Sequence, residues 1–573
     1  MTTFTNLSKK FVSNLTVNQL ITKAKRDLIL SILKSTTTKR EAREYLNKYQ
    51  SQFNPGQSYL RGTLDNESLS LKDNQLNLFI NRFLDGENPF LRIYEDEDEK
   101  IAKIPLRLAI FKLYIHEASP EILKGTAETF RRLVNLGISP VIVLDPGNIS
   151  GNSYKQSSLY VNDQIQTLLK HVFSPTGDGL QLLDSTILRC PYSLHKGTVK
   201  SVPLEQIMIP LYQGIIPIIL PAIYDTENGF QHFINADSAV KYLCADLLNT
   251  SELLTLEKVI FVDKHGGVPS VERNQTSHVF INLSQEFSDI LSELYIGYLD
   301  PKIRDIHIDN LVLMNDILND ATSKAHHETT GIITTPAMLA LNDDQLNPII
   351  YNVLTDRPVI LSSLPSSTKR TPQLSTSIIK RGFPVSVLEE HTYNGEFTFK
   401  NLVRDKLVDQ DRLFSLLEDS FGRKLAAEEF LERINLSIAT IIIVGDYDGA
   451  AIITWETLSS GEKIAYLDKF AIAKKNQGLP SLADIIFKLI SQAHQSELIW
   501  RSRNNNPVNK WYFERSRGSA NVPDSQWKLY FTGEIYDKRM GTKLDGTENE
   551  SVDITQKLKI YSEVVLSIPP SFK

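Results

Sequence analysis

Two arginines and a glycine-containing loop in the C-terminal third of the sequence are both groups that bind anions. Arg501 and Arg503 are two residues apart in the strand-like string ELIWRSR, so their side chains leave the same face of a sheet. Guanidinium groups bind carboxylates through paired hydrogen bonds. The loop KKNQGLPS, residues 474–481, leads into a helical segment whose first-turn amides could hold a pyrophosphate. Together they predict a phosphate-bearing cofactor meeting a small anionic substrate.

The segments around this loop predict a mixed sheet. Residues 464–473 and 497–503 predict strands, and residues 482–494 form an amphipathic helix. Upstream, residues 384–390 predict a strand, residues 410–421 a helix, and residues 438–456 a hairpin. Consecutive antiparallel strands followed by strand, loop and helix are typical of a mixed α/β domain, which we expect over residues 378–573.

An earlier region alternates strands and helices in the pattern of a parallel α/β sheet. Residues 107–115, 140–145, 214–224 and 258–263 predict strands, and residues 119–137 and 235–249 predict helices. We expect this domain to cover residues 101–361, with a Ser/Thr/Pro-rich linker at residues 362–377. Residues 27–100 are expected to form an N-terminal helical region and linker.

The first 26 residues contain lysines and one arginine among many Ser, Thr and Asn, and no acidic residue precedes Asp27. This composition predicts a mitochondrial transit peptide and a location in the matrix, although such peptides favour arginine. The alternative is a solvated N-terminus with no targeting role.

The bulk composition excludes several classes of protein. The chain has 573 residues, too many for one core. A net charge of -6 argues against nucleic acid as a partner, and no apolar run is long enough to span a membrane. Two cysteines cannot form a disulfide framework or a cysteine-based zinc site, and we predict no metal.

The order of elements in the C-terminal region resembles the GNAT acyltransferase superfamily. The superfamily's pyrophosphate loop is commonly Gln/Arg-x-x-Gly-x-Gly/Ala, and here only the basic Lys475 and Gly478 match. The strings YLDKFAIAKKNQG and LIWRSRNNNPVNKWYFERSRGS are similar to the N-acetylglutamate synthases of vertebrate and fungal type. RDLILSIL, STTTKREAREYL and TTGIITTPAML resemble the fungal mitochondrial members, so the resemblance spans nearly the whole chain.

The resemblance implies an amino-acid-kinase-like, three-layer fold for residues 101–361. Such kinases bring glycine amides onto phosphates after the first two strands, whereas this chain has Leu113 and Tyr114 at the first place and Asp145-Pro146-Gly147 at the second. These side chains predict poor phosphate approach and no phosphoryl transfer. The resemblance implies instead that the domain binds arginine as a feedback inhibitor. Asp237 in the NADSA string is either a remnant of the kinase site or a helix cap.

The resemblance implies acetyl-CoA as cosubstrate and L-glutamate as acceptor. Pantetheine is expected to pair with the strand edge at Phe470, Ala471 and Ile472. The pyrophosphate is expected on amides of the loop and helix start, namely Gln477, Gly478, Leu479, Ser481 and Leu482.

Four cations are predicted to bind the two carboxylates of glutamate: Lys424, Lys469, Arg501 and Arg503. For each of them the alternative is an ordinary surface ion pair.

Tyr512 is the predicted general acid, because a positioned phenol can protonate a departing thiolate. The alternative is that Trp511, Tyr512 and Phe513 form an aromatic core patch. Asn506 is predicted to orient the substrate or to stabilise the oxyanion. The sequence identifies no general base.

The sequence therefore predicts an N-acetylglutamate synthase of arginine biosynthesis, acting by direct attack within a ternary complex. Alternatives are a GNAT enzyme acting on another amine, and a catalytically weak regulatory subunit that binds arginine and acetylglutamate kinase. Family members associate with that kinase, so we also expect this complex, together with a homo-oligomer.

Overall fold

The structure is a computed structural model, and it describes residues 106–147, 154–173, 183–195, 198–201, 204–249, 254–271, 276–296, 299–324, 328–342, 347–364, 375–477, 482–536 and 554–573. The predictions for residues 1–100 lie outside these ranges. The chain divides into two compact units. Among described residues, the first unit contains residues 106–359 and 375–382, and the second contains residues 360–364 and 383–573.

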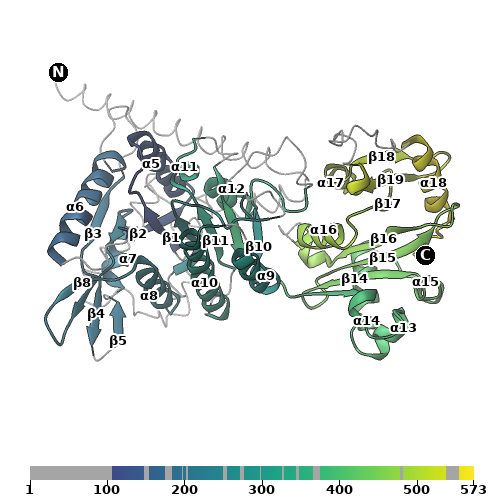
Figure 1. Cartoon of the computed structure of the whole chain (residues 1–573), viewed down its shortest axis with the longest axis horizontal. Coiled ribbons are helices and arrows are strands. Elements are labelled where there is room, and N and C mark those ends of the chain that lie inside the picture. The colour runs from purple at the N-terminus through teal and green to yellow at the C-terminus, as the bar shows by residue number, and fades with distance from the viewer. Residues whose placement is uncertain are drawn as a thin grey trace, which may run out of the picture. The chain divides into compact units, whose positions relative to one another are not determined.

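The first unit is built on an eight-stranded sheet (Figure 1). The order across the sheet is β10 (Phe280–Asn282), β12 (Ser377–Lys380), β11 (Thr330–Thr334), β9 (Leu254–Val262), β1 (Leu106–Tyr114), β2 (Ile138–Asp145), β6 (Ile216–Ile219) and β3 (Ser185–Leu188). The β11–β12 pair is antiparallel and the other pairs are parallel. A parallel-rich sheet of this kind confirms the predicted fold class.

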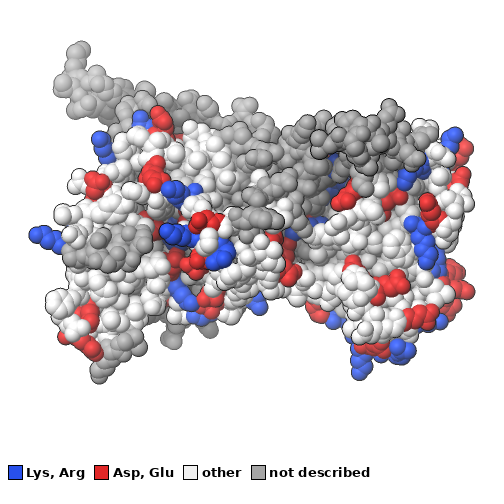
Figure 2. Space-filling view, viewed as in Figure 1, with Lys and Arg blue, Asp and Glu red and all other residues white. Residues whose placement is uncertain are grey.

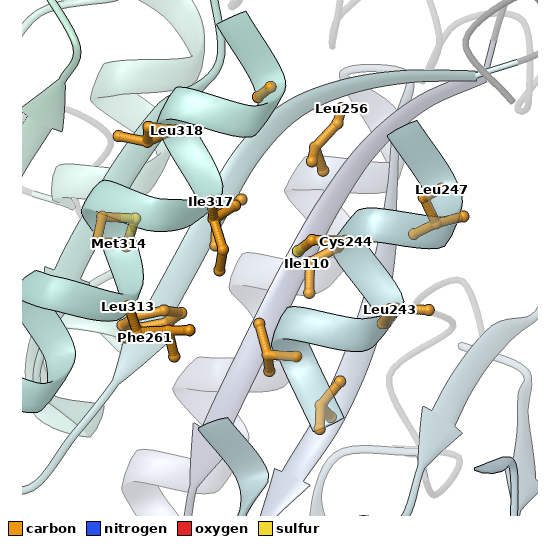
Figure 3. Close-up of a cluster of buried hydrophobic side chains, with 14 of the residues drawn as sticks. Ile110, Leu243, Cys244, Leu247, Leu256, Phe261, Leu313, Met314, Ile317 and Leu318 are labelled. Carbon is orange, nitrogen blue, oxygen red and sulfur yellow. The ribbon is translucent and has the colours of Figure 1, made fainter. Parts of the chain in front are cut away.

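Helices cover both faces of this sheet, which accounts for its almost uniformly apolar strands. One face carries α5 (Pro120–Asn135), α11 (Pro336–Leu339) and α12 (Pro348–Thr355). The other carries α8 (Ala236–Leu248), α9 (Leu283–Ile296) and α10 (Pro301–Lys324). Figure 3 shows side chains of α8 and α10, among them Cys244, Leu247, Met314 and Ile317, packed beside Ile110 and Phe261 of the sheet. The remaining helices in the described part of the first unit are α6 (Tyr154–His171) and α7 (Glu205–Tyr212).

The predicted single strand at residues 214–224 is in fact two strands in different sheets. Pro221 separates β6 from β7 (Ala222–Asp225), and β7 joins a second, four-stranded sheet. This sheet has the order β5 (Thr198–Ser201), β4 (Tyr192–His195), β7 and β8 (Gln231–Phe233). A proline donates no backbone hydrogen bond, so it favours such a break.

The second unit contains a seven-stranded mixed sheet, as predicted. Its order is β13 (Val385–Glu389), β14 (Ile438–Val444), β15 (Gly449–Thr457), β16 (Lys463–Ile472), β17 (Leu498–Arg503), β19 (Trp527–Thr532) and β18 (Gly518–Asn521). The β16–β17 pair is parallel and the other pairs are antiparallel.

Two sets of helices cover the two faces of this sheet. The α16 face packs against α16 (Leu482–Ala493) and α17 (Asn509–Arg515). The α18 face packs against α13 (Phe399–Arg404), α14 (Gln410–Phe421), α15 (Ala427–Ile434) and α18 (Ile554–Ser567). Short 3₁₀ turns occur at Glu390–Thr392, Lys474–Asn476 and Glu534–Tyr536.

The boundary between the units differs from the one predicted at residues 362–377. Strand β12 belongs to the first sheet although it lies beyond residue 361, because it pairs with β10 and β11. Ser363, inside the predicted linker, belongs to the second unit. The chain therefore enters the second unit, returns to the first for one strand, and then enters the second again.

None of the helices in the described residues is long and apolar enough to cross a membrane. On the described surface in Figure 2, Lys and Arg side chains lie interspersed with Asp and Glu.

Candidate active site

Strands β16 and β17 separate soon after they meet. Their ladder contains only the pairs Ala465–Leu498 and Tyr466–Ile499. Beyond it, residues 469–472 pair with β15 on one side and with no described strand on the other. A sheet that opens in its centre leaves a strand edge for an extended ligand, and this edge contains the predicted pantetheine residues Phe470, Ala471 and Ile472.

The backbone groups along this edge are not all available. The Ile472 amide donates to Ser420 Oγ at 3.1 Å, and its carbonyl accepts from Gln477 Nε2 at 2.9 Å. Neighbouring residues of a strand present their backbone groups to opposite edges. Phe470 shares the edge of Ile472, so Phe470 is the better placed of the three to pair with pantetheine.

Two of the five residues predicted for the pyrophosphate site can be placed. Gly478, Leu479 and Ser481 lie outside the described residues. Gln477 uses its side-chain amide on Ile472, and Leu482 begins α16 as a buried core residue. The amides at the start of α16 fit the predicted role of an anion-binding helix N-terminus.

Three residues near the start of α16 form a buried network that sequence reasoning missed. Arg515 of α17 is 1% exposed and donates to Asp484 Oδ1 at 2.6 Å and to Ser363 Oγ at 2.8 Å. Ser363 in turn donates to Asp484 Oδ1 at 2.6 Å. The guanidinium compensates the carboxylate in the first turn of α16, so that this helix start does not present an unpaired negative charge to a phosphate.

Tyr512 lies on the α16 face, where β16 and β17 diverge. Its ring contacts Phe470 of β16 at 6.4 Å and Trp500 of β17 at 5.8 Å between ring centroids, and Tyr530 of β19 at 5.6 Å. The hydroxyl forms no hydrogen bond with any residue in the described part of the chain. Burial, and then the nearby Tyr530, raise the pKa of Tyr512, so the phenol keeps its proton.

The aromatic-patch alternative is correct for two of its three residues. Trp511 and Tyr512 both belong to the core on the α16 face, but Phe513 is 62% exposed. A core position does not exclude catalysis, because it also fixes where the hydroxyl points.

Asn506 organises the turn between β17 and α17. Its Nδ2 donates to Ser502 Oγ at 2.8 Å, and its Oδ1 accepts from the amide of Val508 at 3.0 Å. These bonds hold the helix on which Tyr512 lies. One side-chain amide hydrogen of Asn506 is donated to Ser502, so an oxyanion role for Asn506 would depend on the other.

A β-bulge places Asp468 and Lys469 on the same face of the sheet. Ile452 pairs with Lys469, and the next residue Ile453 pairs with Leu467, so Asp468 is the extra residue. Successive residues of a regular strand alternate between faces, and a bulge breaks this alternation. Both charged side chains therefore lie on the α18 face.

Lys469 is held by neighbours within the second unit. Its Nζ donates to Asp468 Oδ2 at 2.7 Å and to Ser571 Oγ at 3.0 Å, and it lies 4.8 Å from the centre of the Phe430 ring. Asp468 also contacts Arg433, which bonds Glu456 at 3.2 Å. Burial opposes ionisation of Asp468, but Lys469 and Arg433 outweigh it and hold its pKa below the ordinary value.

The four predicted acceptor cations differ in what they bind. Arg501 donates to the carbonyl oxygens of Val565 at 2.5 Å, Ile568 at 2.8 Å and Pro569 at 3.3 Å, and it stacks on Trp527 at 4.3 Å. The hydrogen-bond donors of its guanidinium are thus occupied by the C-terminal end of α18 and by the residues after it. The sequence did not reveal this contact.

Arg503 and Lys424 are the cations left available. The Arg503 guanidinium lies 5.9 Å from the Trp527 ring, and it donates no hydrogen bond within the described ranges. Lys424 is exposed, and its ammonium likewise has no ionic partner there. Its carbonyl accepts from the amide of Lys573 at 3.0 Å, which places it beside the same C-terminal residues.

In the first unit, Lys112 near the end of β1 bonds side chains of α8 and α10. Lys112 Nζ donates to Asp237 Oδ1 at 2.5 Å and to Asn310 Oδ1 at 2.6 Å. The Gly147 amide donates to Asp145 Oδ1 at 2.9 Å, so it does not face an open phosphate site. Burial raises the pKa of Asp145 despite Lys112. Within the described residues, no group of three or more His, Cys, Asp or Glu could hold a metal ion.

Comparisons with known proteins show what the chain is similar to. Residues 398–555 match the family model of the N-acetyltransferase domain of N-acetylglutamate synthase. The mitochondrial amino-acid acetyltransferase of Scheffersomyces stipitis is 54% identical, covering 100% of this chain and 99% of its own. That of Candida albicans is 53% identical over 100% of both chains, and that of Aspergillus flavus is 30% identical over 96% and 88%.

Among solved structures, the N-acetylglutamate synthase of Neisseria gonorrhoeae complexed with coenzyme A and L-arginine is 12% identical. It matches 75% of this chain and 96% of its own with a TM-score of 0.36.

Proposed function

The chain belongs to the mitochondrial amino-acid acetyltransferase family, and from this membership we propose that it transfers the acetyl group of acetyl-CoA to the α-amino group of L-glutamate. The main support is the opening between β16 and β17, which has a free strand edge at Phe470, a buried phenol on the α16 face and several cations on the α18 face.

The reaction needs no acyl-enzyme. The neutral amine attacks the thioester carbonyl, the carbon–sulfur bond breaks, and the thiolate takes a proton from Tyr512, which regains one from the nitrogen of the new amide. The raised pKa of the phenol keeps it protonated until then. Its fixed ring contacts hold the hydroxyl at the place where the two strands part.

The acceptor specificity rests on charge. Glutamate brings two carboxylates, and Arg503 and Lys424 are the cations that can bind them directly. Lys469 and Arg501 are already bound by other groups of the second unit, so they add positive charge near the site without binding the carboxylates directly. A lysine side chain or an amino sugar would be repelled by the same cations, so we propose an acidic amino acid as the acceptor.

We also propose that the first unit is regulatory. Its Lys112–Asp237 pair occupies the position where a kinase would hold phosphate, which leaves binding rather than phosphoryl transfer as its role. We propose arginine as the inhibitor, and assembly with acetylglutamate kinase and with further copies of this chain.

The test is an assay of CoA release by the purified protein with glutamate, other amino acids and a lysine peptide, each with and without arginine. We expect release with glutamate that arginine suppresses. Absence of glutamate-dependent release would refute the proposed acceptor, and release unaffected by arginine would refute the proposed inhibitor.

A further inference from the structure

The residues after α18 cross the α18 face of the second sheet, and we call residues 568–573 the C-terminal strap. The carbonyl oxygens of Ile568 and Pro569 accept from Arg501 at 2.8 and 3.3 Å. Further along, the Ala426 amide donates to the carbonyl of Ser571 at 2.9 Å, and the Lys573 amide donates to that of Lys424 at 3.0 Å. In Figure 1 the C end accordingly lies near β16 and α15.

Side chains of the strap enclose Lys469. Ser571 Oγ accepts from its ammonium at 3.0 Å, and the Phe572 ring lies 5.7 Å from it. Phe430 lies on another side at 4.8 Å, and Phe572 is anchored by Phe421, whose ring centroid is 4.6 Å away. Asp468 accepts the remaining hydrogen bonds of the ammonium, through Oδ2 at 2.7 Å and its carbonyl at 3.2 Å.

The strap thus contacts three of the four predicted acceptor cations. It supplies two of the three carbonyl oxygens that bind Arg501, it supplies a ligand and a ring to Lys469, and it pairs with the backbone of Lys424. A carboxylate could reach Arg501 only by displacing three carbonyl oxygens. This arrangement favours a supporting role for Arg501 over direct binding of the substrate.

We propose that the C-terminal strap is a positioning element of the acceptor site, with Arg501 as the residue that fixes its course and Phe572 and Ser571 as the residues that orient Lys469. The proposal rests on the proposed function, because it assigns these roles in a site for an anionic amino acid. Arg501 and the strap then act as one unit, and the acetyl-CoA side of the opening is independent of them.

The experiment compares Phe572→Ala, Phe572→Tyr and Arg501→Ala with the wild type in the full chain. Phe572→Ala should raise the KM for glutamate about five- to tenfold, since it removes a cation–π contact and uncovers Lys469. The KM for acetyl-CoA should stay within about twofold. Phe572→Tyr, which keeps the ring, should restore the wild-type KM, and Pro570→Ala, an exposed change in the same strap, is the matched control.

A double variant tests whether Arg501 acts through the strap. If it does, Arg501→Ala combined with Phe572→Ala should raise the KM for glutamate little more than Arg501→Ala alone, because coupled residues are not additive. Multiplied effects would overturn the proposal. So would an unchanged or lowered KM in Phe572→Ala, or a parallel rise of both KM values, which would indicate a purely structural strap.

A second measurement separates failure of the strap from failure of the proposed acceptor. If the wild type releases no CoA with glutamate, acetylation of Lys469 by an activated acetyl ester still reports on the strap. Mass spectrometry should find Lys469 protected in the wild type and in Pro570→Ala, and modified much faster in Phe572→Ala. Equal rates in all three would overturn the proposal.

Discussion

Tyr512 is a phenol whose surroundings fix both its position and its protonation. Rings from β16, β17 and β19 surround it, and burial raises its pKa. A group that stays protonated and cannot swing away is suited to act late, when negative charge reaches the leaving sulfur.

Replacing Tyr512 by phenylalanine should lower kcat about 100-fold and leave the KM for both substrates nearly unchanged, because the hydroxyl acts mainly in the transition state. Steady-state kinetics with both substrates varied will measure this. Tyr530→Phe removes a neighbouring hydroxyl from the same ring cluster and serves as the control. A loss as large in Tyr530→Phe would assign the effect to packing.

His494 should make the stability of the second unit depend on pH. Burial lowers its pKa to about 4, and its Nε2 lies 2.9 Å from Thr440 Oγ1. The unfolded imidazole titrates near ~6.5, so below that pH only the unfolded state gains the proton. Stability is therefore complete above about pH 6.5 and falls by on the order of 3 kcal/mol as pH approaches 4.

The variant His494→Gln should flatten this dependence. All four tryptophans, Trp455, Trp500, Trp511 and Trp527, lie in the second unit, so tryptophan fluorescence in urea follows its unfolding. The exposed His391→Gln is the control. Parallel curves of unfolding free energy against pH for wild type and His494→Gln would show that His494 is not the source.

At the scale of single residues, the sequence predicted candidate site residues better than it predicted their contacts. Lys469, Arg503 and Tyr512 could be found because each lies in a recognisable string. The partners of Arg501 could not, because they are backbone carbonyls more than 60 residues away, and carbonyls carry no sequence signal.

At the scale of elements, α16 and α17 are joined by the buried pair of Arg515 and Asp484. The guanidinium also stacks on Trp511 at 3.8 Å. Such a pair adds little over an apolar contact, but removal of one partner leaves a buried charge unmatched.

Arg515→Met should therefore destabilise the second unit by about 3–5 kcal/mol, measured by urea unfolding with tryptophan fluorescence. The double variant Arg515→Met with Asp484→Leu should recover most of the loss. The exposed pair of Arg412 and Asp446 offers a control, and Arg412→Met should change stability far less. A double variant less stable than Arg515→Met would contradict this account.

Strands β1, β2, β6 and β9 of the eight-stranded sheet and β13 to β17 of the seven-stranded sheet could be predicted from apolar spacing. Short strands such as β3, β10 and β18 could not. The bulge in β16 could not, because LDK reads equally well as regular alternation. Strand β12 was also missed, since four residues within a Ser/Thr-rich stretch give no period, and its pairing with β10 and β11 is long-range.

At the scale of the whole molecule, the chain crosses between its units more often than two consecutive domains require. Residues 360–364 belong to the second unit, β12 to the first, and the rest to the second. Ser363 is the clearest reason, because its hydroxyl bonds both Asp484 and Arg515.

A fragment of residues 360–573 should accordingly be more stable than one of residues 383–573, by about 1–3 kcal/mol, the cost of leaving a buried polar group without its partner. Thermal unfolding followed by tryptophan fluorescence will compare them. Ser363→Ala in the longer fragment should reduce its stability to that of the shorter one. Equal stability of the two unsubstituted fragments would mean that Ser363 contributes nothing.

Counted against its partner β15, strand β16 is one residue too long, and the surplus residue is Asp468. Deleting it would make Leu467 and Lys469 consecutive in the ladder without turning any other side chain to the opposite face. The acid beside Lys469 is therefore separable from the architecture of the strand. Any stability lost in such a deletion would measure two cations, the partly buried Arg433 and the buried Lys469, deprived of their shared counter-ion, and not damage to the sheet.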